Sequence, residues 1–177
     1  MKTLKIIAIA LLVLVGAVLA FAAMQPDRFT VQRSASIKAP PDRIYPLIAD
    51  FGRWNAWSPY ERKDPAMKRT FSGPASGKGA VYAWEGNGEV GQGRMEIAEA
   101  AVPSKVTLKL DFVKPFEAHN IVDFLLEPKG DATQVTWAMQ GPMPFISKII
   151  CLFVDMDRMV GQDFEAGLAN LKAVAER

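Results

Sequence analysis

Apolar and polar residues alternate along most of the middle of the chain, which is typical of half-buried strands. The cleanest run has apolar residues at every second position: Val106, Leu108, Leu110 and Phe112. Similar patterns predict further strands at residues 29–37, 80–85, 92–100, 119–127 and 133–140. Turn signals separate them, such as Gly86-Asn87-Gly88 and the stretch 128–131. The pattern therefore predicts one strand, then a helical stretch, and then a run of about six strands that begins at Met67.

Two short helices are predicted between the first strand and the rest. Pro41 suits the first turn of a helix, where no amide donor is needed, and Asp42 suits its positive end. Pro46 lies inside this helix and is expected to kink or divide it. A second short helix or turn follows through Trp54 and Trp57.

The C-terminal part changes to a helical period. From Phe145 to about Ala175, apolar residues recur at spacings of three and four, which predicts one long helix. These residues are Ile149, Leu152, Phe153, Met156, Val160, Phe164, Leu168 and Leu171. Strands followed by a packed helix predict an α+β fold, with the helices on one face of an antiparallel sheet.

The N-terminal segment has a different composition. Residues 6–24 carry no charge and follow Lys2 and Lys5. A helix of that length spans about 28 Å, close to the hydrocarbon thickness of a bilayer. We therefore expect a membrane anchor at residues 1–26 and one domain at 27–177. Ala20-Phe21-Ala22 also resembles a signal-peptide cleavage site, so a cleaved signal stays an alternative.

Both alternatives export the domain, because the positive-inside bias keeps Lys2 and Lys5 in the cytoplasm. In a bacterium, a retained anchor would hold the protein in the inner membrane with the domain facing the periplasm. A cleaved signal would release it into the periplasm or outside.

The charges of the whole chain exclude few functions. The net charge of +2 is accounted for by Lys2 and Lys5, which leaves 19 basic and 19 acidic residues elsewhere. Because the basic residues are scattered, we expect no nucleic-acid partner. Cys151 is the sole cysteine, so an intramolecular disulfide is impossible. With one histidine and one cysteine, we expect no metal site and no cofactor.

The start of the domain carries a family resemblance. The segment Ile37-Lys38-Ala39-Pro40-Pro41-Asp42, continuing to Trp54, Trp57 and Pro59, resembles the opening of the START-like or Bet v 1-like superfamily (SRPBCC). More closely, it is similar to bacterial proteins described as polyketide cyclase or dehydrase-like. The resemblance implies a helix-grip fold, in which a curved sheet wraps the C-terminal helix around an elongated apolar cavity.

Several side chains are candidates to line that cavity. Large rings with one polar N–H suit ligand pockets as well as cores. His119 is the one side chain with an ordinary pKa near neutral. The set of candidate ligand-binding residues is Trp84, His119, Trp137, Met139, Met156 and Phe164.

Three functions remain open at this point. The first is a membrane-anchored protein that binds a lipid, quinone or aromatic polyketide-like compound. The second is a cyclase or dehydratase, which would need an inward His119 or a carboxyl with a raised pKa. The third is an envelope protein-interaction module without a ligand. The sequence identifies no catalytic residue and does not indicate an oligomeric state.

Overall fold

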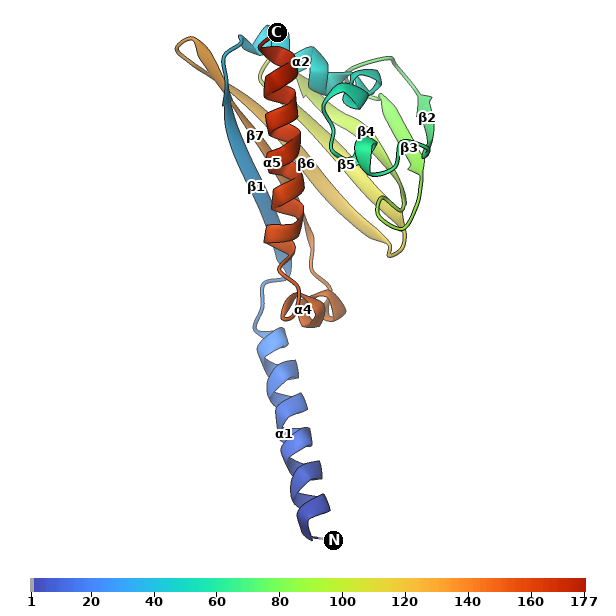
Figure 1. Cartoon of the computed structure of the whole chain (residues 1–177), viewed down its shortest axis with the longest axis vertical. Coiled ribbons are helices and arrows are strands. Elements are labelled where there is room, and N and C mark those ends of the chain that lie inside the picture. The colour runs from blue at the N-terminus through green and yellow to red at the C-terminus, as the bar shows by residue number, and fades with distance from the viewer. Residues whose placement is uncertain (1) are drawn as a thin grey trace.

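A curved antiparallel sheet grips a long C-terminal helix in the computed structural model, which describes residues 2–177 (Figure 1). The seven strands lie in the order β1-β7-β6-β5-β4-β3-β2, so the first strand pairs with the last. This confirms the predicted α+β helix-grip fold. The strands are β1 (Arg28–Ile37), β2 (Lys68–Ser72), β3 (Val81–Glu85), β4 (Gln92–Ala101), β5 (Lys105–Lys114), β6 (Ala118–Lys129) and β7 (Ala132–Pro142).

The inner face of the sheet follows from the alternation in sequence. On β7, Val135, Trp137 and Met139 are buried, whereas their neighbours along the strand are only partly buried. The register sets Val31 of β1 opposite Met139 and Arg33 opposite Trp137. The apolar side chains of six neighbouring strands, β1 and β7 to β3, thereby form one continuous surface on the concave face.

Helix α5 (Met156–Ala175) lies along β1 and β7 on that face (Figure 1). Its glycines allow this close packing. A Cβ at Gly167 would lie 2.6 Å from a ring carbon of Trp137, and a Cβ at Gly161 would collide with the Arg33 guanidinium. The two glycines therefore let the helix approach the strands more closely than any other residue would.

The short helices close the end of the domain near the C-terminus. These are α2 (Pro41–Ala49), the 3-10 helix η1 (Phe51–Ala56) and α3 (Tyr60–Lys63). Trp54 Nε1 donates to the carbonyl of Ile48 at 2.9 Å, and Trp57 Nε1 donates to that of Leu47 at 2.8 Å. Both indoles thus satisfy carbonyls at the end of α2, where a helix lacks partners. Pro46 lies inside α2, as predicted.

The prediction of one helix from Phe145 to Ala175 was wrong. The structure has two helices, α4 (Phe145–Cys151) and α5, separated by residues 152–155. Asp155 is the reason for the break, because its carboxylate accepts the backbone N–H of Arg158 at 2.9 Å and caps a new helix. The apolar spacing continues across the break, so periodicity alone did not reveal it.

Helix α1 (Lys2–Ala23) extends away from the domain below α4 (Figure 1). It is long and apolar enough to cross a membrane, and a signal sequence near an N-terminus has the same properties. Almost all of its side chains are exposed, with the exception of Ala22, which is fully buried near its C-terminal end. Helices α1 and α4 contact each other.

Candidate functional site

The middle of the space between sheet and α5 is filled by aromatic rings. Trp137 stacks on Phe164 of α5 with ring centroids 4.2 Å apart, and Phe124 lies 4.9 Å from Trp137. Trp57 meets Phe124 and Trp137 edge to face. The resemblance implied an elongated cavity along this interface, but over this stretch the structure has packed rings. Such contacts add to the free energy of burial.

An open groove lies where the helix-to-sheet interface begins, at the end nearest α1. Its volume is about 510 Å³. One wall is the start of β1, and the other is the segment that joins α4 to α5. The lining residues are Phe29, Thr30, Val31, Met143, Cys151, Leu152, Phe153, Val154, Asp155, Met156 and Asp157.

Core residues of the sheet and of α5 continue from the groove into the domain. Val31, which lines the groove, pairs with Met139, and the next inner pair is Arg33 with Trp137. On α5, Met156, Val160 and Phe164 are spaced by four residues and so share one face. Met139 thus lies beside the groove residue Val31 on the sheet, and the stacked rings of Trp137 and Phe164 lie farther into the core.

Trp137 also carries an unpaired donor. Its Nε1 is buried without a hydrogen-bond partner, and so is the hydroxyl of Tyr45. Leaving a buried polar group unpaired costs about 1–3 kcal/mol, so such groups call for an explanation. A ligand acceptor that reached Trp137 Nε1 would supply one.

Ion pairs border the groove. Arg33 donates to Asp157 at 2.9 Å and to Glu165 at 2.7 Å, of which the first lies in the first turn of α5 and the second near its middle. The hydrogen bonds to these carboxylates raise the pKa of Arg33, and the bond from Arg33 lowers the pKa of Asp157. Asp157 is thus held ionised, so at the rim it acts as an anchor for the helix and not as a proton donor.

The structure distributes the predicted ligand-binding residues over three environments. Met156 lines the groove. Trp137, Met139 and Phe164 are buried in the core beyond it. Trp84 is buried farther along the sheet, on β3, where its Nε1 donates to the carbonyl of Val90 at 2.9 Å.

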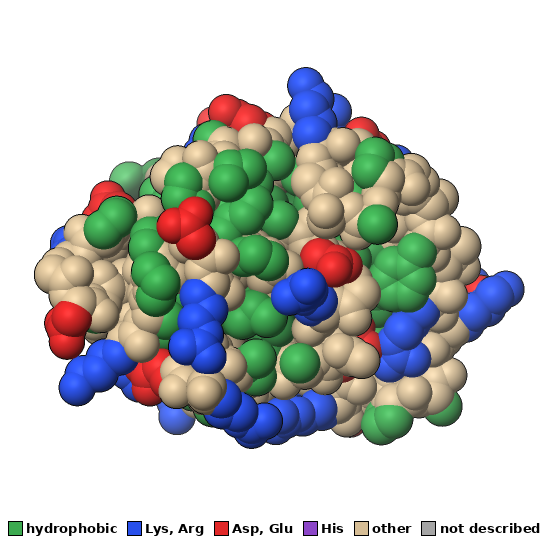
Figure 2. Space-filling model, turned by 90° about the horizontal axis from the view of Figure 1, so that it is seen from above, with side chains coloured by type: hydrophobic (Ala, Val, Ile, Leu, Met, Phe, Trp, Pro, Cys, Tyr) green, Lys and Arg blue, Asp and Glu red, His purple; other side chains and the backbone are tan. Residues whose placement is uncertain are grey.

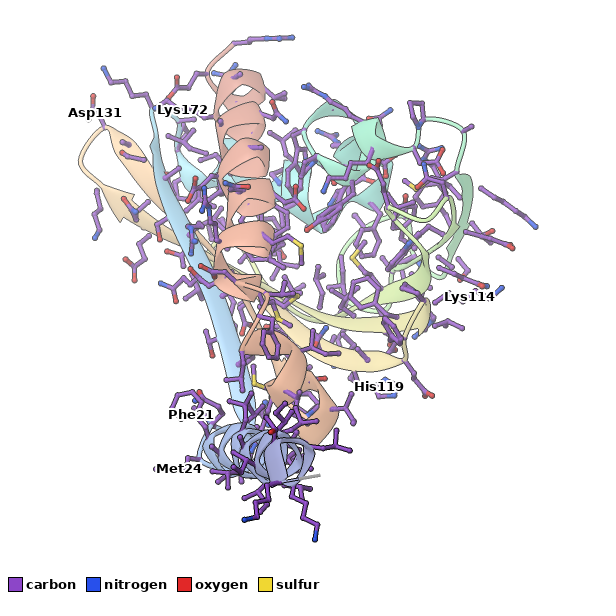
Figure 3. The ribbon with its side chains drawn as sticks, turned by 60° about the horizontal axis from the view of Figure 1, so that its bottom comes forward. Phe21, Met24, Lys114, His119, Asp131 and Lys172 are labelled. Carbon is purple, nitrogen blue, oxygen red and sulfur yellow. The ribbon has the colours of Figure 1, made fainter. Side chains whose placement is uncertain are left out.

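His119 lies apart from the groove, on the surface of β6 (Figure 3). Its side chain is 66% exposed, with Nδ1 2.7 Å from Asp111 and Nε2 3.3 Å from Glu117. The hydrogen bond with Asp111 raises the pKa of His119. This ion-paired surface position has no contact with the groove, so the structure does not provide the inward base that a cyclase based on His119 requires.

Carboxyl chemistry gives no stronger support for a reaction. Hydrogen bonds from Lys148, Arg33 and Lys38 lower the pKa of Asp27, Asp157 and Glu176 respectively, which is opposite to the shift that a general acid needs. Within residues 2–177, no three or more His, Cys, Asp or Glu side chains lie close enough together to hold a metal ion.

Sequence reasoning missed most of the groove. Phe29 and Val31 were placed on the first strand, but nothing marked them as ligand-facing. Leu152 and Phe153 were assigned to the interior of a helix and instead belong to the segment between α4 and α5. The signal that could have found this segment is Asp155 followed by Asp157, an acidic start typical of a new helix.

A curved antiparallel sheet around a C-terminal helix, closed by short helices after the first strand, defines the START-like or Bet v 1-like class. Solved structures agree, with low identity. A protein from Chromobacterium violaceum is 13% identical, with 86% of this chain and 99% of that chain covered and a TM-score of 0.60. Aha1 from Colwellia psychrerythraea is 16% identical, with 84% and 96% covered and a TM-score of 0.59.

Ara h 8.0201 is 10% identical, with 84% of this chain and 97% of that chain covered and a TM-score of 0.56. At these identities the likeness shows the fold alone. A comparison with curated proteins finds no match.

The family is shown by the sequence itself. The chain belongs to the family described as polyketide cyclase / dehydrase and lipid transport, whose profile matches residues 28–176. Because that description concerns hydrophobic molecules, membership supports a function in binding a hydrophobic ligand.

Proposed function

We propose that this protein is a membrane-anchored binding protein for a hydrophobic small molecule. The ligand is a lipid, a quinone or an aromatic, polyketide-like compound. It enters the groove between β1 and the segment joining α4 to α5, and it reaches toward Trp137 and Phe164.

The observation that carries this proposal is the groove itself. Its volume of about 510 Å³ lies within the range of about 300–1,000 Å³ that is usual for small-molecule sites. Phe29, Val31, Leu152 and Met156 supply apolar side chains to its lining, beside polar ones from Thr30, Asp155 and Asp157. The unpaired Nε1 of Trp137 adds one polar group of the kind that orients a bound molecule.

The membrane part of the proposal rests on α1. Residues 1–26 form the anchor and residues 27–177 the binding domain, exported to the periplasmic side of a bacterial inner membrane. The apolar length of α1 and the preceding Lys2 and Lys5 support this assignment. Anchoring would raise the local concentration of any ligand that the bilayer supplies.

The test uses residues 27–177 purified without detergent. The core of this domain lies wholly between Val31 and Ala175, so the domain has its own core without α1. Native mass spectrometry, followed by solvent extraction, measures any bound compound. We expect a stoichiometric apolar molecule, either carried through purification or taken up from a lipid and quinone extract.

Two methionine variants locate the site. Met156→Trp fills the groove and should abolish binding. Met159→Trp places the same ring on the same helix, at an exposed position that does not line the groove, and should leave binding intact. A domain that stays free of ligand, or one that binds equally well in both variants, would reject the proposed site.

The cyclase or dehydratase alternative has the family description in its favour. It would predict turnover of a polyketide-like substrate and a loss of activity in a groove variant such as Met156→Trp. If the protein is instead an interaction module without a ligand, the domain should stay ligand-free and an envelope protein should co-purify with it.

A further inference from the structure

Helix α4 has a polarity opposite to that of an ordinary surface helix. Its one charged residue, Lys148, is 6% exposed and turned toward the protein. Its apolar side chains face outward, with Ile146 67% exposed. A helix in contact with water normally buries the apolar stripe and exposes the charge. The outer face of α4 is thus suited to an apolar environment.

The exposed apolar surface continues past the helix. Phe153 is 77% exposed, and Val154 beside it is also exposed. From Met143 to Val154, Lys148 is the one charged residue in twelve. Its ammonium is held 2.6 Å from the carboxylate of Asp27, the last residue before β1. This ion pair fixes the orientation of α4 with the lysine inward.

The exposed apolar surface of α4 lies next to α1, and this position indicates what covers it. Ala22 near the end of α1 is fully buried, and α1 and α4 are in contact. Phe21 and Met24, both exposed, lie at that end of α1 (Figure 3). The outward face of α4 is therefore continuous with the apolar surface of α1. A helix of 22 residues is about 33 Å long, so its end lies near the boundary of the hydrocarbon layer.

We propose that residues 145–154 form a second membrane contact, in which α4 and the segment after it lie in the interface of the bilayer that α1 crosses. This inference rests on the proposed role of α1 as an anchor. Because the groove shares residues 151–154 with the contact, its mouth opens at the level of the lipid.

The opposite end of the domain lacks such a surface arrangement. Figure 2 views the domain from that side, where basic and acidic side chains are spread among hydrophobic ones. Val102, in the turn between β4 and β5, is 71% exposed and lies far from α1. It is a matched apolar control.

The experiment uses the full chain, in vesicles made of equal parts of phosphatidylcholine and phosphatidylglycerol. Cys151→Ser removes the native thiol, and nitroxide labels are attached to Ile146→Cys or Phe153→Cys. Collisions with oxygen report on lipid, and collisions with a water-soluble nickel chelate report on water. We expect both labels to favour oxygen, at depths of about 5–10 Å below the headgroups.

Two further labels separate the possible failures. A label at Leu14→Cys tests whether α1 lies in lipid, and one at Val102→Cys should favour the nickel chelate. If position 14 lies in lipid but 146 and 153 lie in water, the second contact is disproved while the anchor stands. If position 14 also lies in water, both proposals fail. Labels at 146 and 153 shielded from both reagents would indicate a protein partner and would also overturn the inference.

Salt gives an independent readout. The contact is apolar, and its one charge, on the buried Lys148, is paired with Asp27. At ~1 M salt, where screening acts within about 3 Å, the depth at position 153 should be unchanged. Withdrawal of the label at high salt would show an electrostatic association and contradict the proposal.

Discussion

The two ends of the domain are built on opposite principles. At the end away from α1, polar side chains donate to backbone carbonyls, although the buried hydroxyl of Tyr45 has no partner. Thr133 donates to the carbonyl of Ala39 at 2.7 Å, and Asn170 donates to that of Trp57 at 3.1 Å. At the end next to α1, large apolar side chains are exposed and Lys148 is turned inward. The two ends thus differ in the chemistry of the side chains that they expose.

The comparison also separates stability from function. The far end is closed by rings, caps and hydrogen bonds from side chains of the last helix to the backbone, such as Lys172 Nζ to the carbonyl of Ser36 on β1 at 2.6 Å. The near end holds the groove and the break between α4 and α5. Substitutions should therefore lower the free energy of unfolding most at the far end and change binding most at the near end.

The strongest test of this contrast is Trp57→Ala. Trp57 is fully buried, packs on three other rings and caps α2. We expect the free energy of unfolding to fall by about 3–5 kcal/mol, as for other buried aromatic truncations. Urea unfolding of residues 27–177 measures it. A loss below ~1 kcal/mol would mean that the far end does not carry the stability of the fold.

Two glycines of α5, Gly161 and Gly167, allow the effects of substitution on stability to be compared along one helix. In Gly167→Ala the new methyl group would press on Trp137 and on Pro59, 3.0 Å away, so we expect a loss of about 1–3 kcal/mol. In Gly161→Ala it meets the flexible end of Arg33. There the gain in helix propensity of about 1 kcal/mol offsets the loss of partly exposed ion pairs. Thermal unfolding of both variants gives the comparison, and equal losses would contradict it.

The ion pair of Asp27 and Lys148 tests the near end. Asp27→Asn leaves a largely buried lysine without its partner, whereas Lys148→Met removes the buried charge altogether. We expect Asp27→Asn to lower the unfolding midpoint more than Lys148→Met does. Since pairing lowers the pKa of Asp27, its contribution exists above the ordinary carboxyl pKa and is lost as the pH falls through the lowered one. The loss of stability in Asp27→Asn, measured against the wild-type chain, should therefore shrink in strong acid.

The smallest effect is expected at His119. Its pKa is raised by Asp111, so its contribution to stability is complete below the ordinary histidine pKa and is lost as the pH rises through the raised one. His119→Gln should slightly reduce stability in mild acid and leave it unchanged in alkali. Unfolding midpoints over a pH series measure this, and ligand binding by the domain should be unaffected at every pH.

Much of the fold could be predicted because most strands have one buried face, with β2 as an exception. Alternation such as Val106, Leu108 and Leu110 reports that face directly, and all three are buried. The break at Asp155 was not predicted, because the apolar spacing continues through it. The helix cap that causes the break is a local signal that the spacing does not contain.

The candidate site could be predicted less well, for a related reason. Apolar spacing predicts burial, and Trp137, Met139 and Phe164 are indeed buried, but burial does not separate a filled core from a pocket wall. The groove forms from Phe29 and Leu152, which lie more than a hundred residues apart and meet only in the folded chain. Their role as ligand contacts, like that of Met156, is part of the proposal.

The connection between α1 and β1 limits what an anchored protein could do with its cargo. Residues 24–27 are the whole tether, and four extended residues reach at most about 14 Å. With Asp27 further tied to Lys148, an anchored domain would have almost no freedom to leave the bilayer surface. Such a protein cannot ferry molecules across the gap to another membrane. It would instead stay at one membrane, extract a molecule from its own leaflet and transfer it to a diffusing acceptor.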